Sequence, residues 1–472
     1  MPKLTGFAPL PIPGRPPVPL LGHIPRVFQL FADPIGVLIE LRKHGDVAAV
    51  AAGSPAFVCA FGPERNKEVL TNPTGFRHDE DFITGPEGSS LAKLSKVLVS
   101  INGELHKRHR KLMTPAFSKA ALDGYASGIV EVSEAMIERW PIGEVADLDV
   151  LTRNLALCVA VRSLFGLDIR SGADELGALA VELVDTLTTP LTILLPYDLP
   201  GLPYRRASRL GDRMVVEIER LIARKRAASE LGDDALSMLV RAVDEQGGLS
   251  DAELIGETLT LFIAGHETTA KTLTWTLFLL ERHPEILAAL LDELDGVLGG
   301  RSVELADLPA LPLLERVIKE SMRVLTPVPI LFLRVPSADI PLGRFVLPKG
   351  ANVVISPYVT HHDPALYRDP ERFDPERWTS LDPTPFEYLP FGAGPRMCIG
   401  AAFARQALRL ILATLLQRVR FSLVRGTEVS RLTRGNILMP KRGLMVHLQA
   451  AHRERLRVEP IKGDIGELVT LA

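Results

Sequence analysis

The chain of 472 residues is poor in cysteine, with only Cys59, Cys158 and Cys398. These three are far apart, odd in number and without the paired spacing of zinc ligands. A disulfide framework is therefore not expected, and a reducing compartment such as the cytoplasm fits. The chain also lacks a basic excess, since its formal net charge is −3. That balance argues against a nucleic-acid-binding protein.

A long hydrophobic run is also missing from the N-terminus. Residues 1–25 carry eight prolines and no apolar stretch long enough for a signal peptide or a membrane anchor. We interpret this segment as an extended, proline-rich lead-in. With 46% apolar and 24% charged residues, the composition is that of an ordinary soluble globular protein.

The apolar pattern predicts a mainly α-helical fold with a small β lobe. Apolar residues three and four apart run from about residue 105 to 325, which is typical of amphipathic helices. Shorter strand-like runs are at 47–52, 56–61, 330–335, 344–347, 352–355 and 444–448. We expect residues 1–472 to form one domain around a buried ligand. Residues 451–472 are predicted to be a solvated tail or an edge strand, without an assigned function.

The most informative segment is 391–400, which reads Phe-Gly-Ala-Gly-Pro-Arg-Met-Cys-Ile-Gly. Cys398 closes this glycine-rich loop just before a predicted helix over 401–417, where a helix N-terminus favours a thiolate. Arg396 can pair with a carboxylate on a ligand. A loop-borne thiolate suits axial ligation of haem iron, where it promotes O–O cleavage. The alternative interpretation is a buried free cysteine in a glycine turn.

A long helix is predicted over residues 251–282, which contain no proline and precede Pro284. Ser250 and Glu253 form a capping-box pattern at its start. Its centre reads Ala264-Gly265-His266-Glu267-Thr268-Thr269, which is unusual in an apolar helix.

The small residues in this centre leave room beside the helix. A Thr268 hydroxyl bonded to the carbonyl four residues back would open a polar notch. The alternative is an ordinary buried helix with Glu267 in a salt bridge. We interpret His266 as a structural histidine facing another helix.

Residues 391–400 resemble the haem-binding signature of the cytochrome P-450 family of haem-thiolate monooxygenases, and further motifs extend the resemblance over about residues 10–450. It implies a soluble, bacterial-type member with haem b between the long helix and the helix after Cys398. Cys398 would bind the iron, with Phe391 as part of the haem site. Thr268 and Glu267 would deliver protons during oxygen activation.

The resemblance also assigns charged residues around the haem. His106 and Arg110, four apart on one helix face, would hold the propionates with Arg334 and Arg396. The alternative for His106 and Arg110 is a merely basic helix face. The alternative for Arg334 is a surface arginine on a strand. A buried structural triad would contain Glu320, Arg323 and Arg377, although a doubled Pro-Glu-Arg motif leaves its register open.

The family's substrate-recognition segments correspond here to residues 82–99, 186–202 and 328–333. Ala264, Val328 and Ile330 are the predicted pocket residues. The last two segments are largely apolar, so the expected substrate is a lipophilic terpenoid, steroid, polyketide or fatty acid.

The resemblance implies insertion of one oxygen atom of O2 by hydroxylation or epoxidation. No flavin or ferredoxin segment follows the haem region, so electrons would come from a separate ferredoxin or flavodoxin with its reductase. A basic patch is predicted to receive this partner, made up of Lys107, Arg108, Lys111, Arg405 and Arg409. The alternatives are a peroxide-driven or non-oxygenating haem-thiolate enzyme, or a non-catalytic haem sensor or carrier.

Overall fold

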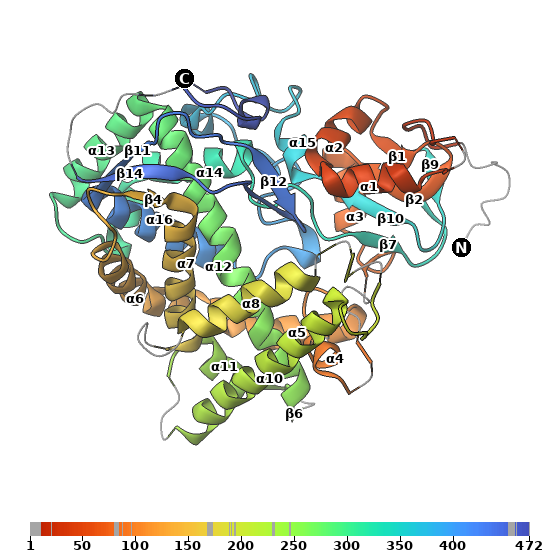
Figure 1. Cartoon of the computed structure of the whole chain (residues 1–472), viewed down its shortest axis with the longest axis horizontal. Coiled ribbons are helices and arrows are strands. Elements are labelled where there is room, and N and C mark those ends of the chain that lie inside the picture. Colours follow the sequence, from red (N-terminus) through yellow and green to blue (C-terminus); the bar gives the residue numbers. More distant parts are fainter. Residues whose placement is uncertain are drawn as a thin grey trace.

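The computed structural model describes residues 11–471 except 20, 80–84, 87, 96, 168–172, 188, 190, 193–194, 229–231, 245–246, 452–457 and 459. A large helical body and a smaller sheet-containing lobe lie side by side (Figure 1). The lobe is on the right of Figure 1, with α1, α2 and most of the N-terminal strands. The predicted fold class, mainly α with a small β lobe, is confirmed.

Helices make up most of the described chain. The α-helices are α1 Ile24–Ala32, α2 Pro34–Arg42, α3 Pro63–Leu70, α4 Ser90–Ser95, α5 Gly103–Met113, α6 Lys119–Ile137, α7 Leu148–Phe165, α8 Ala173–Leu187, α10 Pro203–Ala227, α11 Ala235–Arg241, α12 Asp251–Arg282, α13 Pro284–Leu298, α14 Pro312–Val324, α15 Pro357–His361 and α16 Ala401–Arg418. Short 3₁₀ helices are η1 Thr114–Phe117, η2 Leu305–Ala310, η3 Pro375–Thr379, η4 Gly394–Arg396 and η5 Ile465–Glu467.

The main sheet of the lobe has the order β1-β2-β10-β7-β3. Its strands are β1 Val47–Ala51, β2 Ser54–Ala60, β10 Asn352–Ile355, β7 Arg334–Pro336 and β3 Phe76–His78. A second sheet has the order β11-β14-β4, formed by Val419–Leu423, Met445–Ala450 and Val145–Asp147. Three strand pairs complete the described sheets: β12 Arg431–Arg434 with β13 Ile437–Pro440, β8 Ile340–Leu342 with β9 Phe345–Leu347, and β5 Val243–Asp244 with β6 Gly247–Gly248.

The prediction of one strand, over residues 330–335, is largely wrong. The expected strand over 330–335 is realised only from Arg334 onward, in β7. Ile330 and Leu333 pack against the helical core, whereas Leu331 packs against the core of the sheet lobe. The apolar run therefore reflects a segment that bridges two cores, and not a strand with one buried face.

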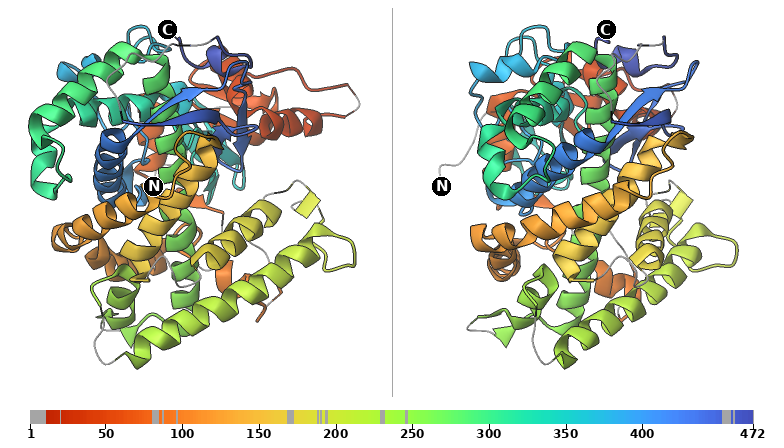
Figure 2. Two further views of the ribbon diagram at one scale, coloured as in Figure 1. Left: turned by 60° about the vertical axis from the view of Figure 1, so that its left-hand side comes forward. Right: turned by 90° about the vertical axis from the view of Figure 1, so that its left-hand side faces the viewer.

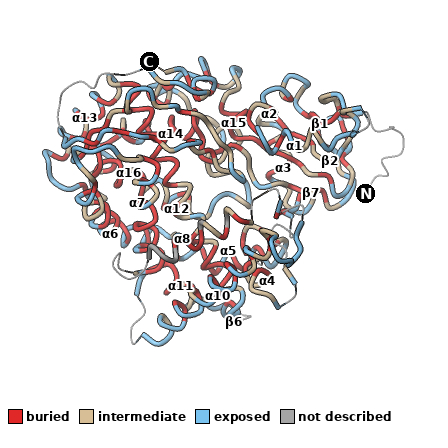
Figure 3. The backbone as a smooth tube through the Cα atoms, in the orientation of Figure 1, coloured by how far each residue is buried: buried red, intermediate tan, exposed pale blue. Residues whose placement is uncertain are grey.

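Helix α12 crosses the middle of the molecule (Figures 1 and 2). Its bounds match the prediction, and the Ser250–Glu253 capping box is present. Most of its residues are buried (Figure 3). A Cβ added at Gly265 would lie 2.8 Å from Leu164 on α7, so glycine allows the two helices to pack closely. The expected room beside Gly265 is thus filled by α7.

The C-terminal segment is not a solvated tail or an edge strand where the structure describes it. Ile465, Leu468 and Val469 are at most 1% exposed and join the helical core. The Thr470 N–H donates to the Glu371 carbonyl oxygen at 2.8 Å. Part of the predicted segment, residues 452–457, 459 and 472, lies outside the described residues, as do 1–10 and 20 of the lead-in.

We expect Leu468→Ala to lower the free energy of unfolding by about 2–4 kcal/mol, because it opens a cavity in a packed core. The measurement is chemical denaturation followed by circular dichroism. Leu199→Ala is the control, because Leu199 is 56% exposed and its truncation should stay within about 0.5 kcal/mol. Equal effects of the two substitutions would show that the segment does not stabilise the fold.

Candidate active site

The predicted cysteine loop is a tight turn between η4 and α16. The Cys398 N–H donates to the Phe391 carbonyl oxygen at 2.9 Å. Gly394 has a φ of +72°, and a Cβ there would lie 2.3 Å from the Leu70 carbonyl oxygen. Only glycine tolerates both the left-handed backbone and this close approach. Gly394 is therefore required for the turn that presents Cys398.

Cys398 keeps an exposed face just before α16 begins. Desolvation by the surrounding protein nevertheless raises the pKa of its thiol, although a backbone hydrogen bond to Gly400 and the positive charge of Arg110 act in the opposite direction. The backbone at the start of the helix thus favours the thiolate, as expected from sequence, but desolvation outweighs this effect. A coordinated metal cation deprotonates a thiol outright, so this sulfur suits a metal ligand.

Two of the predicted haem-binding arginines anchor the loop. Arg110 on α5 donates from Nη1 to the Met397 carbonyl oxygen at 2.8 Å. Arg396 donates from Nη2 to the Ile101 carbonyl oxygen at 2.7 Å and to Asn102 Oδ1 at 2.8 Å. The loop is therefore tied to α5 and to the segment before it.

Arg334, Arg396 and His106 form a cationic cluster in which Arg334 is only 5% exposed. No carboxylate of the described residues pairs with Arg334, which donates to the Phe332 carbonyl oxygen at 2.9 Å. Burial and the Arg396 charge lower the pKa of Arg334 to about 9. Burial, followed by the charges of Arg396 and Arg110, lowers the pKa of His106 to about 4. Both pKa shifts arise first from burial and then from neighbouring positive charge, each of which disfavours the protonated form.

This cationic cluster fits a ligand that carries carboxylates, as haem does through its propionates. The four predicted cations are brought into electrostatic contact with one another or with the Cys398 loop. Sequence reasoning missed His78 and Asn102, which lie beside this cluster. A histidine at the end of a three-residue strand gives no signal in the sequence, because only the pairing of β3 with β7 brings it there.

The side-chain hydrogen bond expected on α12 is present, but it does not open the helix as the predicted notch requires. Thr268 Oγ1 donates to the Ala264 carbonyl oxygen at 2.9 Å. The helix stays continuous through this point, so the bond does not interrupt it. Ala264 is exposed and Thr268 is half-buried, and they share one face because they are four residues apart. This face of α12 is open, whereas Gly265 packs on α7.

Glu267 is held in an ion network between α12 and α7. Its Oε1 lies 3.2 Å from Lys271 Nζ. Lys271 is fully buried, and its Nζ also lies 2.7 Å from Asp149 Oδ1. Its Oε2 lies 3.6 Å from Arg153 Nε and 3.7 Å from His266 Nε2. Lys271, Asp149 and Arg153 were missed, because no sequence motif connects α7 to the centre of α12.

The contacts of His266 are those of a structural histidine, as expected. Its Nδ1–H donates to the Phe262 carbonyl oxygen at 2.6 Å, and the ring is 1% exposed. Burial lowers its pKa, so the imidazole is neutral.

The predicted charge triad is assembled around Glu320. Its carboxylate accepts from Arg323 Nε and Nη2, both at 2.9 Å, and from Arg377 Nε at 2.8 Å. Arg372 contributes only its backbone carbonyl oxygen, which settles the register of the doubled motif. The Trp378 indole N–H, which sequence reasoning missed, also donates to Glu320 at 2.9 Å.

The predicted pocket residues are accessible to different degrees. Ala264 is exposed, and Val328 and Ile330 are half-buried. The predicted recognition segments 82–99 and 186–202 fall partly outside the described residues.

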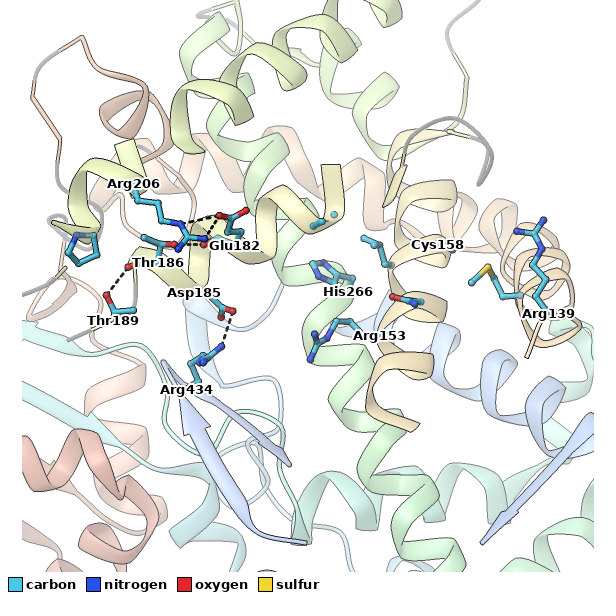
Figure 4. A pocket seen from close by; sticks show the side chains of 16 residues that line it. Arg139, Arg153, Cys158, Glu182, Asp185, Thr186, Thr189, Arg206, His266 and Arg434 are labelled. Carbon is cyan, nitrogen blue, oxygen red and sulfur yellow. Dashed lines mark hydrogen bonds and ion pairs between the residues drawn. The ribbon is translucent and has the colours of Figure 1, made fainter. Parts of the chain in front are cut away.

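A polar cavity of about 780 Å³ lies between α6, α7, α8, α10, α12 and β12 (Figure 4). The Arg206–Glu182 and Arg434–Asp185 ion pairs, at 2.6 and 2.8 Å, line it. None of the three predicted pocket residues contributes to its wall. Arg153 and His266, the neighbours of Glu267, do. The cavity therefore borders the side of Glu267 that faces α7.

The predicted basic patch is only partly free to meet a partner. Lys107, Lys111 and Arg405 are exposed. Arg108 instead donates to the Gly248 carbonyl oxygen at 2.9 Å, and Arg409 lies 3.7 Å from Glu315. Arg108 and Arg409 are thus engaged within the chain, which leaves three exposed cations in the predicted patch, and one of these, Lys107, pairs with Glu104 at 2.7 Å.

Comparison with known proteins decides the family. The family model for cytochrome P-450 matches residues 12–448. The chain belongs to the cytochrome P-450 family. It is 34% identical over 440 residues to the cyclooctat-9-en-7-ol 5-monooxygenase of Streptomyces melanosporofaciens, with 91% of this chain and 92% of the relative covered.

Two further comparisons agree. The chain is 32% identical over 434 residues to the pentalenene oxygenase of Streptomyces avermitilis, covering 90% of this chain and 94% of that protein. The structure of the retinoic acid-bound cyanobacterial CYP120A1 superimposes with a TM-score of 0.81 at 26% identity, covering 94% of this chain and 100% of the other. This cytochrome P-450 is an oxidoreductase of the monooxygenase type, and its family implies a haem cofactor.

Proposed function

We propose that this cytochrome P-450 uses haem b, with Cys398 as its thiolate ligand, to insert one oxygen atom of O2 into a cyclic terpenoid. The observation that supports this most is the glycine loop that presents Cys398 beside Arg396 and the buried Arg334, which pairs with no carboxylate of the described residues. Relatives named for the oxidation of cyclooctat-9-en-7-ol and pentalenene favour a terpenoid over the other lipophilic classes. When bound, haem supplies the activation of O2 for attack on a C–H or C=C bond.

The roles of the haem-binding side chains follow from their chemistry. Cys398 Sγ would bind the iron, and Phe391 would contribute an apolar wall beside it. His106, Arg110, Arg334 and Arg396 would hold the propionates by charge-assisted hydrogen bonds. An iron with an anionic sulfur donor is suited to O–O cleavage.

Thr268 and Glu267 would move the protons that oxygen activation consumes. The Thr268 hydroxyl lies on the open face of α12, where its bond to the Ala264 carbonyl oxygen fixes its direction. Glu267 is next to it in sequence, and its α7-facing side borders the polar cavity through Arg153 and His266. A peroxide-driven enzyme would not need such a relay, so the adjacent Glu267 and Thr268 favour an O2-dependent monooxygenase.

The remaining assignments concern the substrate contacts, the electron donor and the compartment. Ala264, Val328 and Ile330 would line the apolar substrate pocket. A separate ferredoxin or flavodoxin with its reductase would dock on the exposed cations Lys107, Lys111 and Arg405. We propose a single haem domain that works in the cytoplasm. No helix of the described ranges has the length and apolarity needed to cross a bilayer.

A ligand screen tests the substrate class. Purified, haem-loaded protein is titrated with cyclic terpenoids, steroids, polyketides and fatty acids, and the Soret absorbance is followed. We expect cyclic terpenoids to shift the Soret band and to yield oxygenated products with O2, NADPH and generic redox partners. Shifts and products with fatty acids alone would overturn the substrate assignment, and NADPH-dependent turnover without any oxygenated product would overturn the monooxygenase assignment.

Thr268→Ala is expected to keep haem and substrate binding but to lower the rate of product formation by roughly 10²-fold, because positioned proton transfer is worth about 10²- to 10⁴-fold. Reductant consumption should then yield hydrogen peroxide. The measurement is product and peroxide formed per NADPH consumed. Thr269→Ala is the matched control, since its hydroxyl makes the same type of bond, to the Gly265 carbonyl oxygen at 3.1 Å, but is buried. Full coupling in Thr268→Ala would remove that residue from the relay.

A further inference from the structure

His78 ends strand β3 and lies directly opposite Arg334 on β7. Cross-strand partners in an antiparallel pair project to the same face of the sheet, so the imidazole and the guanidinium are neighbours. His78 is only 8% exposed. A polar residue this deeply buried next to a buried cation requires an explanation.

Asn102 connects His78 to the cysteine loop. Its Nδ2 donates to the His78 carbonyl oxygen at 3.0 Å, and its Oδ1 accepts from the His78 N–H at 3.0 Å. The same Oδ1 accepts from Arg396 Nη2 at 2.8 Å. One amide therefore fixes the backbone of His78 and the side chain of Arg396 relative to each other.

The described residues do not provide hydrogen-bond partners for both ring nitrogens of the His78 imidazole. One ring nitrogen hydrogen-bonds the Val99 backbone. His78 Nε2 is buried and has no hydrogen-bond partner among the described residues. Leaving such a group unpaired costs roughly 1–3 kcal/mol. The position is thus unfavourable unless a ligand meets Nε2.

The charges around His78 indicate what that ligand is. The groups that face it are Arg334 on β7, Arg396 on η4 and His106 on α5. All three are cationic or become cationic on protonation. Burial and the two arginine charges lower the pKa of His78 to about 2. An anion placed among these groups would reverse this shift and allow Nε2 to carry a proton.

We propose that His78 is a haem-positioning residue whose Nε2–H donates to a cofactor carboxylate, alongside Arg334, Arg396 and His106. This inference rests on the proposed haem site and adds a residue that its motifs do not contain. A carboxylate beside the imidazole favours its protonated form, so His78 takes up one proton from solvent when the carboxylate arrives. Haem binding is then linked to proton uptake at neutral pH.

The test measures the rate at which haem passes from the protein to excess apomyoglobin. A hydrogen bond to a charged group is worth about 1.5–3 kcal/mol, which corresponds to a roughly 10- to 100-fold faster loss in His78→Phe. His78→Lys, which restores a charged donor, should recover slow loss with a weaker pH dependence. His78→Leu serves the same comparison if the phenylalanine variant does not fold.

His362→Phe is the matched control. The ring of His362 stacks on that of Tyr358, with 4.0 Å between the ring centroids. Its Nε2 is likewise buried without a hydrogen-bond partner among the described residues. Its replacement should leave haem loss unchanged. Wild-type loss rates in both His78→Phe and His78→Leu would overturn the role of His78. Failure of the wild-type chain to bind haem at all would instead overturn the proposed function.

Discussion

Cys398→His is expected to abolish monooxygenase activity while allowing haem to bind. Imidazole can occupy the axial position, but a neutral ligand does not donate the electron density with which an anionic sulfur promotes O–O cleavage. The reduced carbon monoxide complex should lose the red-shifted Soret maximum of a thiolate-bound haem. Turnover with O2 and redox partners should fall to the background of free haem. Both readouts use protein at matched haem content.

The control is Cys158→Ala, which removes another cysteine, one that lies in the wall of the polar cavity. It should keep the thiolate spectrum and most of the activity. A thiolate-type spectrum that survives in Cys398→His and vanishes in Cys158→Ala would place the iron ligand elsewhere in the chain.

Glu320→Gln is expected to cost roughly 3–5 kcal/mol of folding free energy, the usual effect of stranding a buried charge. The Glu320 carboxylate accepts five hydrogen bonds, from Arg323, Arg377, Trp378 and the Asp374 N–H. Glu320 and Arg323 are both fully buried, so neither water nor salt can replace the lost charge. Denaturant unfolding and the yield of haem-loaded protein measure the effect.

Glu315→Gln on the same helix α14 is the matched control. Its carboxylate is 48% exposed and lies 3.7 Å from Arg409. Exposed pairs of this kind contribute at most about 1 kcal/mol. If the two substitutions destabilised the protein equally, burial of the charge triad would not explain its importance.

Local patterns in the sequence predicted the elements that local forces define. The bounds of α12 were predicted correctly because Ser250 caps its start and Pro284 follows its end. Strand β10 was also predicted residue for residue. The pairing of Glu320 with Arg323 follows from helical spacing alone. The wider haem site was predicted only through resemblance to a family.

Long-range packing decided what these patterns did not contain. The run over 330–333 has strand-like composition but bridges two cores. Leu468 lies in the segment that was predicted to be a solvated tail or an edge strand, yet it is fully buried. Arg108 and Arg409, predicted to be free for a redox partner, are engaged by the chain itself.

The sequence by itself determined the cysteine loop, the long helix with its acid and hydroxyl, and the family to which they belong. These features depend on residues close together in the chain, where glycine geometry, capping and helical spacing act directly. Only the tertiary structure decided that His78 lies opposite Arg334 and that Glu267 lies against Arg153. Such contacts join residues far apart in sequence, and burial of apolar surface, not any local pattern, brings them together.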